Sequence, residues 1–207
     1  NNLGRIKRRI DLVPDIPGDA RLRINDNMDK LFADIDIFKK ISDERESGLV
    51  DFEAVNVREA LAGVIRQYSD FADFSFRDGM SPPTIFASQA LLKTVFENLI
   101  DNAIKYKKPE QERAQISLAF SLDIDGQRRY VSLSFRDEGI GMDEQEADKC
   151  FYKGKGSQEG WGQGLYFVKY VIGLHAGKIR VGKEYTASGV GTEIIMNMPF
   201  VEESLNV

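Results

Sequence analysis

Residues 96–106 read FENLIDNAIKY, and the interpretation of the rest of the chain depends on this stretch. Apolar residues recur here at spacings of three and four, which predicts a helix over about 88–106 with one buried face. Asn98 and Asn102 lie four residues apart beside that face, and Lys105 continues their row one turn later. Asparagine is a mediocre helix former, so the pair suggests a ligand: amide oxygens suit Mg²⁺, and the lysine suits phosphate. A solvated polar helix face is the alternative.

A second candidate site residue follows a predicted strand. Residues 130–136 alternate between apolar and polar types, which is typical of a strand with one buried face. Asp137 has the parity of the apolar residues, so its carboxylate should point inward and needs a donor. The exocyclic amine of adenine is a suitable donor, and Gly139 and Gly141 would let a flat ring approach the backbone. An aspartate in a surface turn is the alternative.

A third candidate is a glycine-rich loop that leads directly into a helix. Five glycines lie within residues 154–164, and an apolar helical pattern over 163–175 follows. Free N–H groups at a helix N-terminus, together with the helix dipole, favour phosphate. The loop matches neither the dinucleotide-binding fingerprint nor a P-loop. On its own it fits a flexible connector as well as a phosphate-binding loop.

The N-terminal part predicts a helical hairpin. Residues 3–13 carry a helical apolar stripe, Pro14 to Gly18 interrupts it, and a second stripe follows Asp19. One hairpin buries two such stripes poorly, so we expect two copies to form a dimeric four-helix bundle; packing on the chain's own domain is the alternative. Residues 43–48 read as a linker. We therefore expect a dimerisation domain over 1–47 and a second domain over 48–207.

The second domain reads as mixed α and β. Beside the segments above, we expect a helix over 56–70 and strands over 115–121, 178–181 and 192–198. Asp125-Gly126 suggests a hairpin turn between two of the strands.

Composition narrows the class of protein. The chain has 207 residues, 42% apolar and 29% charged, which is ordinary for a soluble globular protein. The net charge of −5, with scattered cations, argues against nucleic-acid binding. The single cysteine, Cys150, suits a reducing compartment, and no apolar run reaches membrane-spanning length. We expect a cytoplasmic fragment that makes no membrane contact itself, while a longer parent protein could carry an anchor.

The order of the motifs resembles one family. The series is NLIDNAIKY at Asn98–Tyr106, DEGIG at Asp137–Gly141, CFY at Cys150–Tyr152, GQGL at Gly162–Leu165, and Gly191-Thr192. It resembles the gyrase, heat-shock chaperone and histidine-kinase ATPase superfamily, and more narrowly the catalytic domain of sensor histidine kinases. The resemblance covers residues from about 54 to 200.

The resemblance implies a fold and a site. The implied fold is α+β, a two-layer α/β sandwich in which a mixed sheet carries helices on one face. ATP would lie between the Asn98 helix and a lid over 153–164. Asn102 would hold Mg²⁺ with Asn98 beside it, and Asp137 would bind the adenine amine. The implied ATP-binding set is Asn98, Asn102, Lys105, Tyr106, Asp137, Gly139, Gly141, Gly162, Gly164, Leu165 and Thr192.

The resemblance also bears on the reaction. Gyrase-type members carry a glutamate base one turn before the metal-binding asparagine, and here that position is Asn98. This favours phosphoryl transfer to a protein side chain over hydrolysis. Glu97 is adjacent but rotated by roughly 100° around the helix, so no base role is assigned to it.

The phosphoacceptor is expected outside this chain. The single histidine, His175, falls where the family often has a structural histidine. Asn1-Asn2-Leu3 aligns with the end of the family's His-Glu-x-Arg-Thr/Asn-Pro-Leu motif, with Asn2 in place of the proline, which would place the acceptor four residues before Asn1. We expect a homodimeric ATP-dependent histidine kinase that passes phosphoryl groups to an aspartate of a response-regulator receiver domain. The alternatives are an ATP-binding regulatory module or pseudokinase, and a serine kinase of the anti-sigma type.

Overall fold

The computed structural model describes most of one part of this chain. The described residues are 51–77, 84–125, 128–152 and 164–199, with Pro17, Ala20 and Ile24. The chain divides into two compact units, Asn1–Glu46 and Ser47–Val207. The predicted hairpin, its linker and residues 153–163 of the predicted lid lie outside the described residues. The hairpin and its dimerisation therefore stay predictions, and the fold below is that of the second unit alone.

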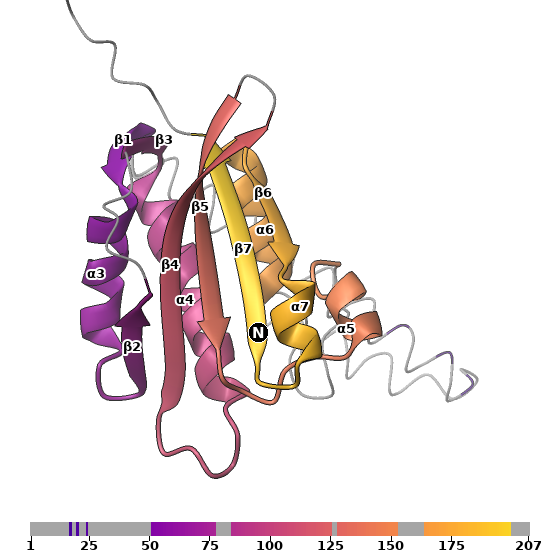
Figure 1. The fold of residues 1–207 in the computed structure, drawn as a ribbon. Helices are drawn as coiled ribbons and strands as arrows, with labels where there is room; N and C mark the ends of the chain where they lie inside the picture. Colours follow the sequence, from indigo (N-terminus) through magenta and orange to yellow (C-terminus); the bar gives the residue numbers. More distant parts are fainter. Residues whose placement is uncertain are drawn as a thin grey trace, which may run out of the picture. The chain divides into compact units, whose positions relative to one another are not determined.

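A mixed five-stranded sheet forms one layer of this unit. Its strand order is β2-β4-β5-β7-β6, with β2 parallel to β4 and the other neighbours antiparallel (Figure 1). The strands are β2 (Ala72–Phe76), β4 (Ala114–Asp125), β5 (Arg128–Asp137), β6 (Lys178–Val181) and β7 (Thr192–Pro199). All four strands expected from the sequence are present, although β4 is longer than the predicted 115–121.

Helices form the second layer. Figure 1 shows α4 (Gln89–Lys105) and α6 (Gly164–Leu174) lying behind the sheet, and α3 (Val57–Gln67) packs beside α4. A separate antiparallel pair, β1 (Glu53–Asn56) with β3 (Thr84–Ala87), lies near the start of α4. Two short helices, α5 (Glu144–Lys149) and α7 (Lys183–Ala187), flank β6. This arrangement confirms the predicted two-layer α/β sandwich. None of the described helices is long and apolar enough to cross a membrane.

The core forms where the apolar faces of β5 and β7 pack against the apolar face of α4. Most of the buried apolar side chains of β5 and β7 share one parity, and those of the predicted stripe of α4 are buried too. They are Val131, Leu133, Phe135, Ile194, Met196 and Met198 from the strands and Leu92, Val95, Leu99 and Ala103 from the helix. Because β5 and α4 end at the edge of the sheet where the antiparallel β7 begins, the polar residues at these ends meet there.

His175 joins the end of α6 to the beginning of α4. Its Nε2 accepts a hydrogen bond from the Ser88 N–H at 3.0 Å, and its Nδ1 lies 2.7 Å from the Val171 carbonyl oxygen. Since Nε2 is an acceptor, Nδ1 carries the proton and the ring is neutral. The ring is buried against Phe52, with ring centroids 5.0 Å apart, and this burial lowers the pKa of His175. The geometry is that of a structural residue.

The neutral state of His175 predicts a pH dependence of stability. Because its pKa lies below the usual 6.5, the unfolded chain takes up the proton first as the pH falls. The contribution of neutral His175 to the free energy of unfolding is fully present above pH 6.5. It is lost as the pH falls towards the folded pKa, by up to about 1.4 kcal/mol per pH unit. Urea melts at several pH values would measure it. His175→Gln, which keeps an acceptor but does not titrate, should flatten the slope; an unchanged slope in that variant would contradict the assignment.

Candidate functional site

The two asparagines of α4 face the first residue of α6. A Cβ built on Gly164 would lie 3.1 Å from Asn98 Oδ1 and 3.8 Å from Asn102 Oδ1. The structure thus brings the predicted asparagine pair and the last glycine of the loop together, although they lie more than 60 residues apart in the sequence. Asn98 donates from Nδ2 to the Thr94 carbonyl at 2.8 Å. This bond within the helix orients its amide, which answers the objection that asparagine is a poor choice in mid-helix.

Asp137 ends β5 with its carboxylate held by backbone donors. Its Oδ1 accepts hydrogen bonds from the N–H groups of Gly139 at 2.9 Å and Thr192 at 3.4 Å. Asp137 is half-buried and pairs with Thr192 in the register of β5 and β7. Burial raises the pKa of the carboxyl, and the two backbone N–H groups and the charge of Lys108 oppose that rise. The inward orientation expected from strand parity is therefore present, and Thr192 is buried beside it.

Glycines allow the backbone to crowd around Asp137. A Cβ on Gly139 would collide with the Tyr106 carbonyl oxygen, and the Ile140 N–H donates to that same oxygen at 2.9 Å. Gly141 has a φ of +76°, which glycine adopts without strain. A Cβ on Gly191 would collide with the Asp137 carbonyl oxygen. The turn after β5 is thus fixed between the end of α4 and the start of β7. Gly191 was quoted in the motif series but not placed in the expected set, and its close contact adds it to the site.

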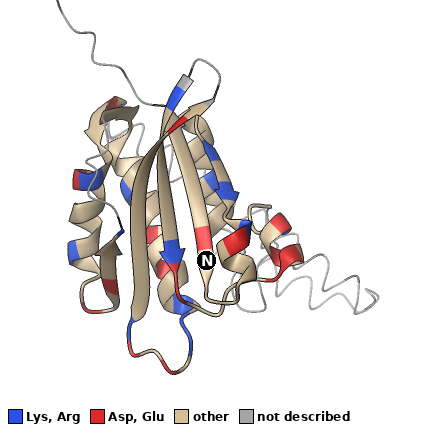
Figure 2. Ribbon diagram, in the orientation of Figure 1, with Lys and Arg blue, Asp and Glu red and all other residues tan. Residues whose placement is uncertain are grey.

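Cations gather at the end of α4, where Figure 2 shows Lys and Arg in blue. Lys107 and Lys108 donate to the carbonyl oxygens of Gln111 and Val190, at 2.6 and 3.1 Å. Lys105 is exposed, and its Nζ lies 5.2 Å from the ring centroid of Tyr106, the residue that caps α4. Lys108 was not predicted from the sequence, although its charge acts on Asp137.

Two predicted residues remain to be placed. Leu165, the second residue of α6, is half-buried beside Gly164. Gly162 lies outside the described residues. The described members of the predicted set therefore lie on the second half of α4, at the end of β5 and the turn after it, and at the starts of β7 and α6.

Glu97 points away from the asparagine row. Burial, together with the carboxylates of Asp101 and Glu97, raises the pKa of Tyr68, the residue that caps α3, to about 12. Glu97 also lies 3.8 Å from Lys93, one turn earlier on α4. The effect on Tyr68 indicates that Glu97 lies towards α3, which agrees with leaving it without a base role.

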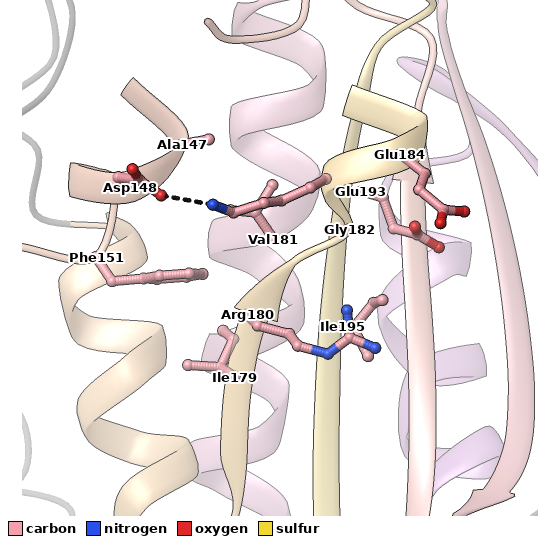
Figure 3. Close-up of a pocket in the computed structure, with 11 residues that line it drawn as sticks. Ala147, Asp148, Phe151, Ile179, Arg180, Val181, Gly182, Glu184, Glu193 and Ile195 are labelled. Atoms are coloured by element: carbon pink, nitrogen blue, oxygen red, sulfur yellow. Dashed lines mark hydrogen bonds and ion pairs between the residues drawn. The ribbon is translucent and has the colours of Figure 1, made fainter. Parts of the chain in front are cut away.

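A pocket of about 660 Å³ lies elsewhere, around the edge strand β6. Figure 3 shows Phe151 on one side and Arg180 and Ile195 along the strands. Asp148 forms an ion pair with Lys183 at 3.0 Å. None of its lining residues belongs to the predicted set. Ile195 has the opposite parity to Thr192 on β7, so this part of the wall lies on the other face of the sheet.

Known proteins share these features. Residues 87–202 match the family described as histidine kinase-, DNA gyrase B- and HSP90-like ATPase. Sensor protein RprX of Bacteroides fragilis is 28% identical over 171 residues, which cover 77% of this chain and 31% of that protein. Sensor histidine kinase WalK of Bacillus subtilis is 30% identical over 122 residues, 56% of this chain and 19% of that protein. This chain thus spans less than a third of the length of either relative.

A solved structure gives the same result for the fold. The mycobacterial sensor histidine kinase MprB is 26% identical, with a TM-score of 0.54 over 72% of this chain and 97% of that chain. The match to the ATPase family begins at the end of β3 and includes the asparagine helix, the DEGIG turn and the start of α6. With these motifs in one place, the chain belongs to the histidine kinase-, DNA gyrase B- and HSP90-like ATPase family, as a catalytic domain of the sensor histidine kinase kind.

Proposed function

We propose that this chain is the ATP-binding catalytic part of a protein histidine kinase, an ATP:protein-L-histidine phosphotransferase. One observation carries the proposal: the asparagine pair lies against the start of α6, while the end of the same helix α4 holds the turn that carries Asp137. Domains of this family bind ATP, and the relatives include sensor histidine kinases. We place the protein in the cytoplasm, as a whole or as part of a membrane-anchored sensor.

Adenine recognition is assigned to Asp137. The N–H groups of Gly139 and Thr192 fix one carboxylate oxygen as an acceptor. The carboxylate can then accept the exocyclic amine of adenine through its remaining lone pairs. The ring would lie against Gly139 and Gly141, where the backbone is not shielded by side chains.

Phosphate binding is assigned to the beginning of α6 and the end of α4. Gly162, Gly164 and Leu165 would offer backbone N–H groups at the start of the 11-residue helix α6. Lys105 adds a charge near Tyr106, which faces the nucleotide in this assignment.

The asparagine pair fits Mg²⁺. The point that a Cβ on Gly164 would occupy lies 3.1 Å from Asn98 Oδ1, 3.6 Å from Asn102 Nδ2 and 3.8 Å from Asn102 Oδ1, so both amides, whose oxygens suit Mg²⁺, lie near the start of α6. Asn102 would hold the ion with Asn98 beside it, and the ion would neutralise phosphate charge.

The transfer itself needs little from the described side chains. An imidazole nitrogen of an acceptor histidine upstream of Asn1 forms a bond to the γ-phosphorus, and the bond from that phosphorus to the bridging oxygen of ADP breaks. The phosphoryl group then passes to an aspartate of a response-regulator receiver domain. Positioning and charge neutralisation supply the rate. The hairpin over 1–47 would form the homodimer, and the linker over 43–48 would let the catalytic domain reach the acceptor.

Replacing the carboxylate tests the adenine assignment. Asp137→Asn should weaken ATP binding by roughly ten- to a hundredfold, as measured by calorimetry. The backbone N–H groups of Gly139 and Thr192 would keep the oxygen of the new asparagine as their acceptor. Its NH₂ group would then face the exocyclic amine of adenine, and both groups are donors. Asp73→Asn is the control, because Asp73 is an exposed partner of Arg113 at 3.1 Å on β2. Unchanged affinity in Asp137→Asn would remove the assignment.

Removing an amide ligand tests the metal assignment. Mg²⁺ should tighten ATP binding to the wild-type chain, and Asn102→Ala should lose most of that gain while binding ATP in EDTA as the wild type does. Asn197→Ala is the control, because Asn197 contacts Asp123 at 3.0 Å towards the other end of β7. Titrations with and without Mg²⁺ would separate the two. An undiminished Mg²⁺ gain in Asn102→Ala would rule out that ligand.

Phosphotransfer requires the segment upstream of Asn1. A longer chain that includes it, supplied with ³²P-labelled ATP, should acquire phosphate that is labile in acid and stable in base. The longer chain carrying Asp137→Asn should acquire far less. Acid-stable phosphate on a partner serine would support the serine kinase instead. Nucleotide binding without any transfer would favour the regulatory module.

A further inference from the structure

A polar network lies behind Asp137, on the face of the sheet opposite to α4 and α6. It joins α7 to β5 and β7 through Tyr185, Arg136 and Glu193. We propose that Tyr185 is a positioning residue for adenine recognition, which fixes the Asp137 peptide from the side opposite to the base. This inference rests on the proposed function, in which Asp137 accepts the adenine amine.

The Tyr185 hydroxyl holds the main chain of Asp137. It donates to the Asp137 carbonyl oxygen at 3.1 Å. The side chain of the same residue accepts from Gly139 and Thr192. Asp137 is therefore held at both its carbonyl and its carboxylate, while the N–H of the same peptide, that of Glu138, donates to the Gln115 carbonyl at 3.1 Å. Without the hydroxyl, the peptide after Asp137 would lose its contact with α7, and the carboxylate would be held by the two backbone donors alone.

The tyrosine ring is itself held in place. The guanidinium carbon of Arg136 lies 4.7 Å from the ring centroid of Tyr185, a cation–π contact. Arg136 pairs with Glu193 in the register of β5 and β7, and its Nε donates to Glu193 Oε1 at 2.8 Å. Ser134 donates to the same oxygen at 2.5 Å. Although burial opposes it, these donors hold the pKa of Glu193 below its usual 4.5, so the pair stays charged at neutral pH.

The short helix α7 is tied to β7 by its own backbone. The Gly182 N–H donates to the Glu193 carbonyl at 2.8 Å, and the Glu193 N–H donates to Thr186 Oγ1 at 3.2 Å. Figure 3 shows Glu193 beside Gly182, where a Cβ on the glycine would collide with the carboxylate. The hydroxyl of Tyr185 thus reaches Asp137 from a fixed support. Burial and the nearby Glu138 and Asp137 carboxylates raise the pKa of Tyr185, so the hydroxyl stays a donor at neutral pH.

The test compares two nucleotides that differ only in the group that Asp137 would recognise. ATP carries the exocyclic amine, and purine riboside triphosphate lacks it. Calorimetry on the full chain gives the ratio of their affinities, which isolates the contribution of the carboxylate. Tyr185→Phe removes one hydroxyl and should shrink the wild-type ratio by about three- to tenfold, which is the scale of one hydrogen bond. The loss should fall mainly on ATP.

Two further variants sharpen the result. Tyr130→Phe is the control, because Tyr130 lies on β5 opposite Pro199, far from Asp137, and should keep the wild-type ratio. Arg136→Lys keeps the charge and the Tyr185 hydroxyl but loses the planar group over the ring. It should give a ratio between those of the wild type and Tyr185→Phe.

Each outcome has one meaning. A reduced ratio in Tyr185→Phe, with the control unchanged, supports positioning. A wild-type ratio in Tyr185→Phe, whether or not both nucleotides bind more weakly, overturns it and leaves a structural role. If the wild-type chain binds ATP and purine riboside triphosphate equally well, the adenine assignment of the proposed function fails, and the positioning role fails with it.

Discussion

The site depends on one constraint, which is the half-buried carboxylate at the end of β5. Such a group is costly unless donors surround it, and here the N–H groups of Gly139 and Thr192 supply them. For those donors to reach it, the backbone of the following turn and of β7 must approach more closely than side chains allow. Gly139 and Gly191 meet that need, because a Cβ on either would strike a carbonyl oxygen. The glycines of the motif are thus a consequence of the carboxylate.

The sheet and α4 carry this constraint to the asparagine pair. The Tyr106 carbonyl at the end of α4 accepts from Ile140, so the turn that holds the carboxylate is fixed to the helix that carries Asn98 and Asn102. The apolar stripe of α4 packs on the sheet, which sets the rotation of the helix about its axis. The same rotation turns Glu97 towards Tyr68 and the two asparagines towards Gly164. The way α4 packs on the sheet therefore keeps the Glu97 carboxylate apart from the two asparagine amides that face the start of α6.

The sequence predicted mainly those helices and strands whose apolar residues repeat regularly along the segment. The helix over 88–106 and four strands were foreseen because their apolar residues repeat over several turns or pleats. The strands β1, β2 and β3 and the helices α5 and α7 were not predicted, because four to six residues carry little periodicity. The four-residue strand β6 is the exception among the short elements. Asp137 and the asparagine pair were predicted from parity and spacing. The support from Tyr185 could not be, because it joins residues 48 apart through a five-residue helix that has no apolar stripe.

A transfer that relies on positioning makes the outer face of the sheet important. With Glu97 turned towards α3, the described residues next to the asparagines offer amides and cations, which orient and neutralise phosphate but do not take up a proton from water. In the proposed function, the place of the γ-phosphorus follows from where Asp137 anchors the base at the other end of the nucleotide. On that proposal, Tyr185, Arg136 and Glu193 hold the anchor from behind. A small displacement of Asp137 would shift the whole nucleotide relative to the acceptor, and misplacement of this kind costs rate even where binding survives.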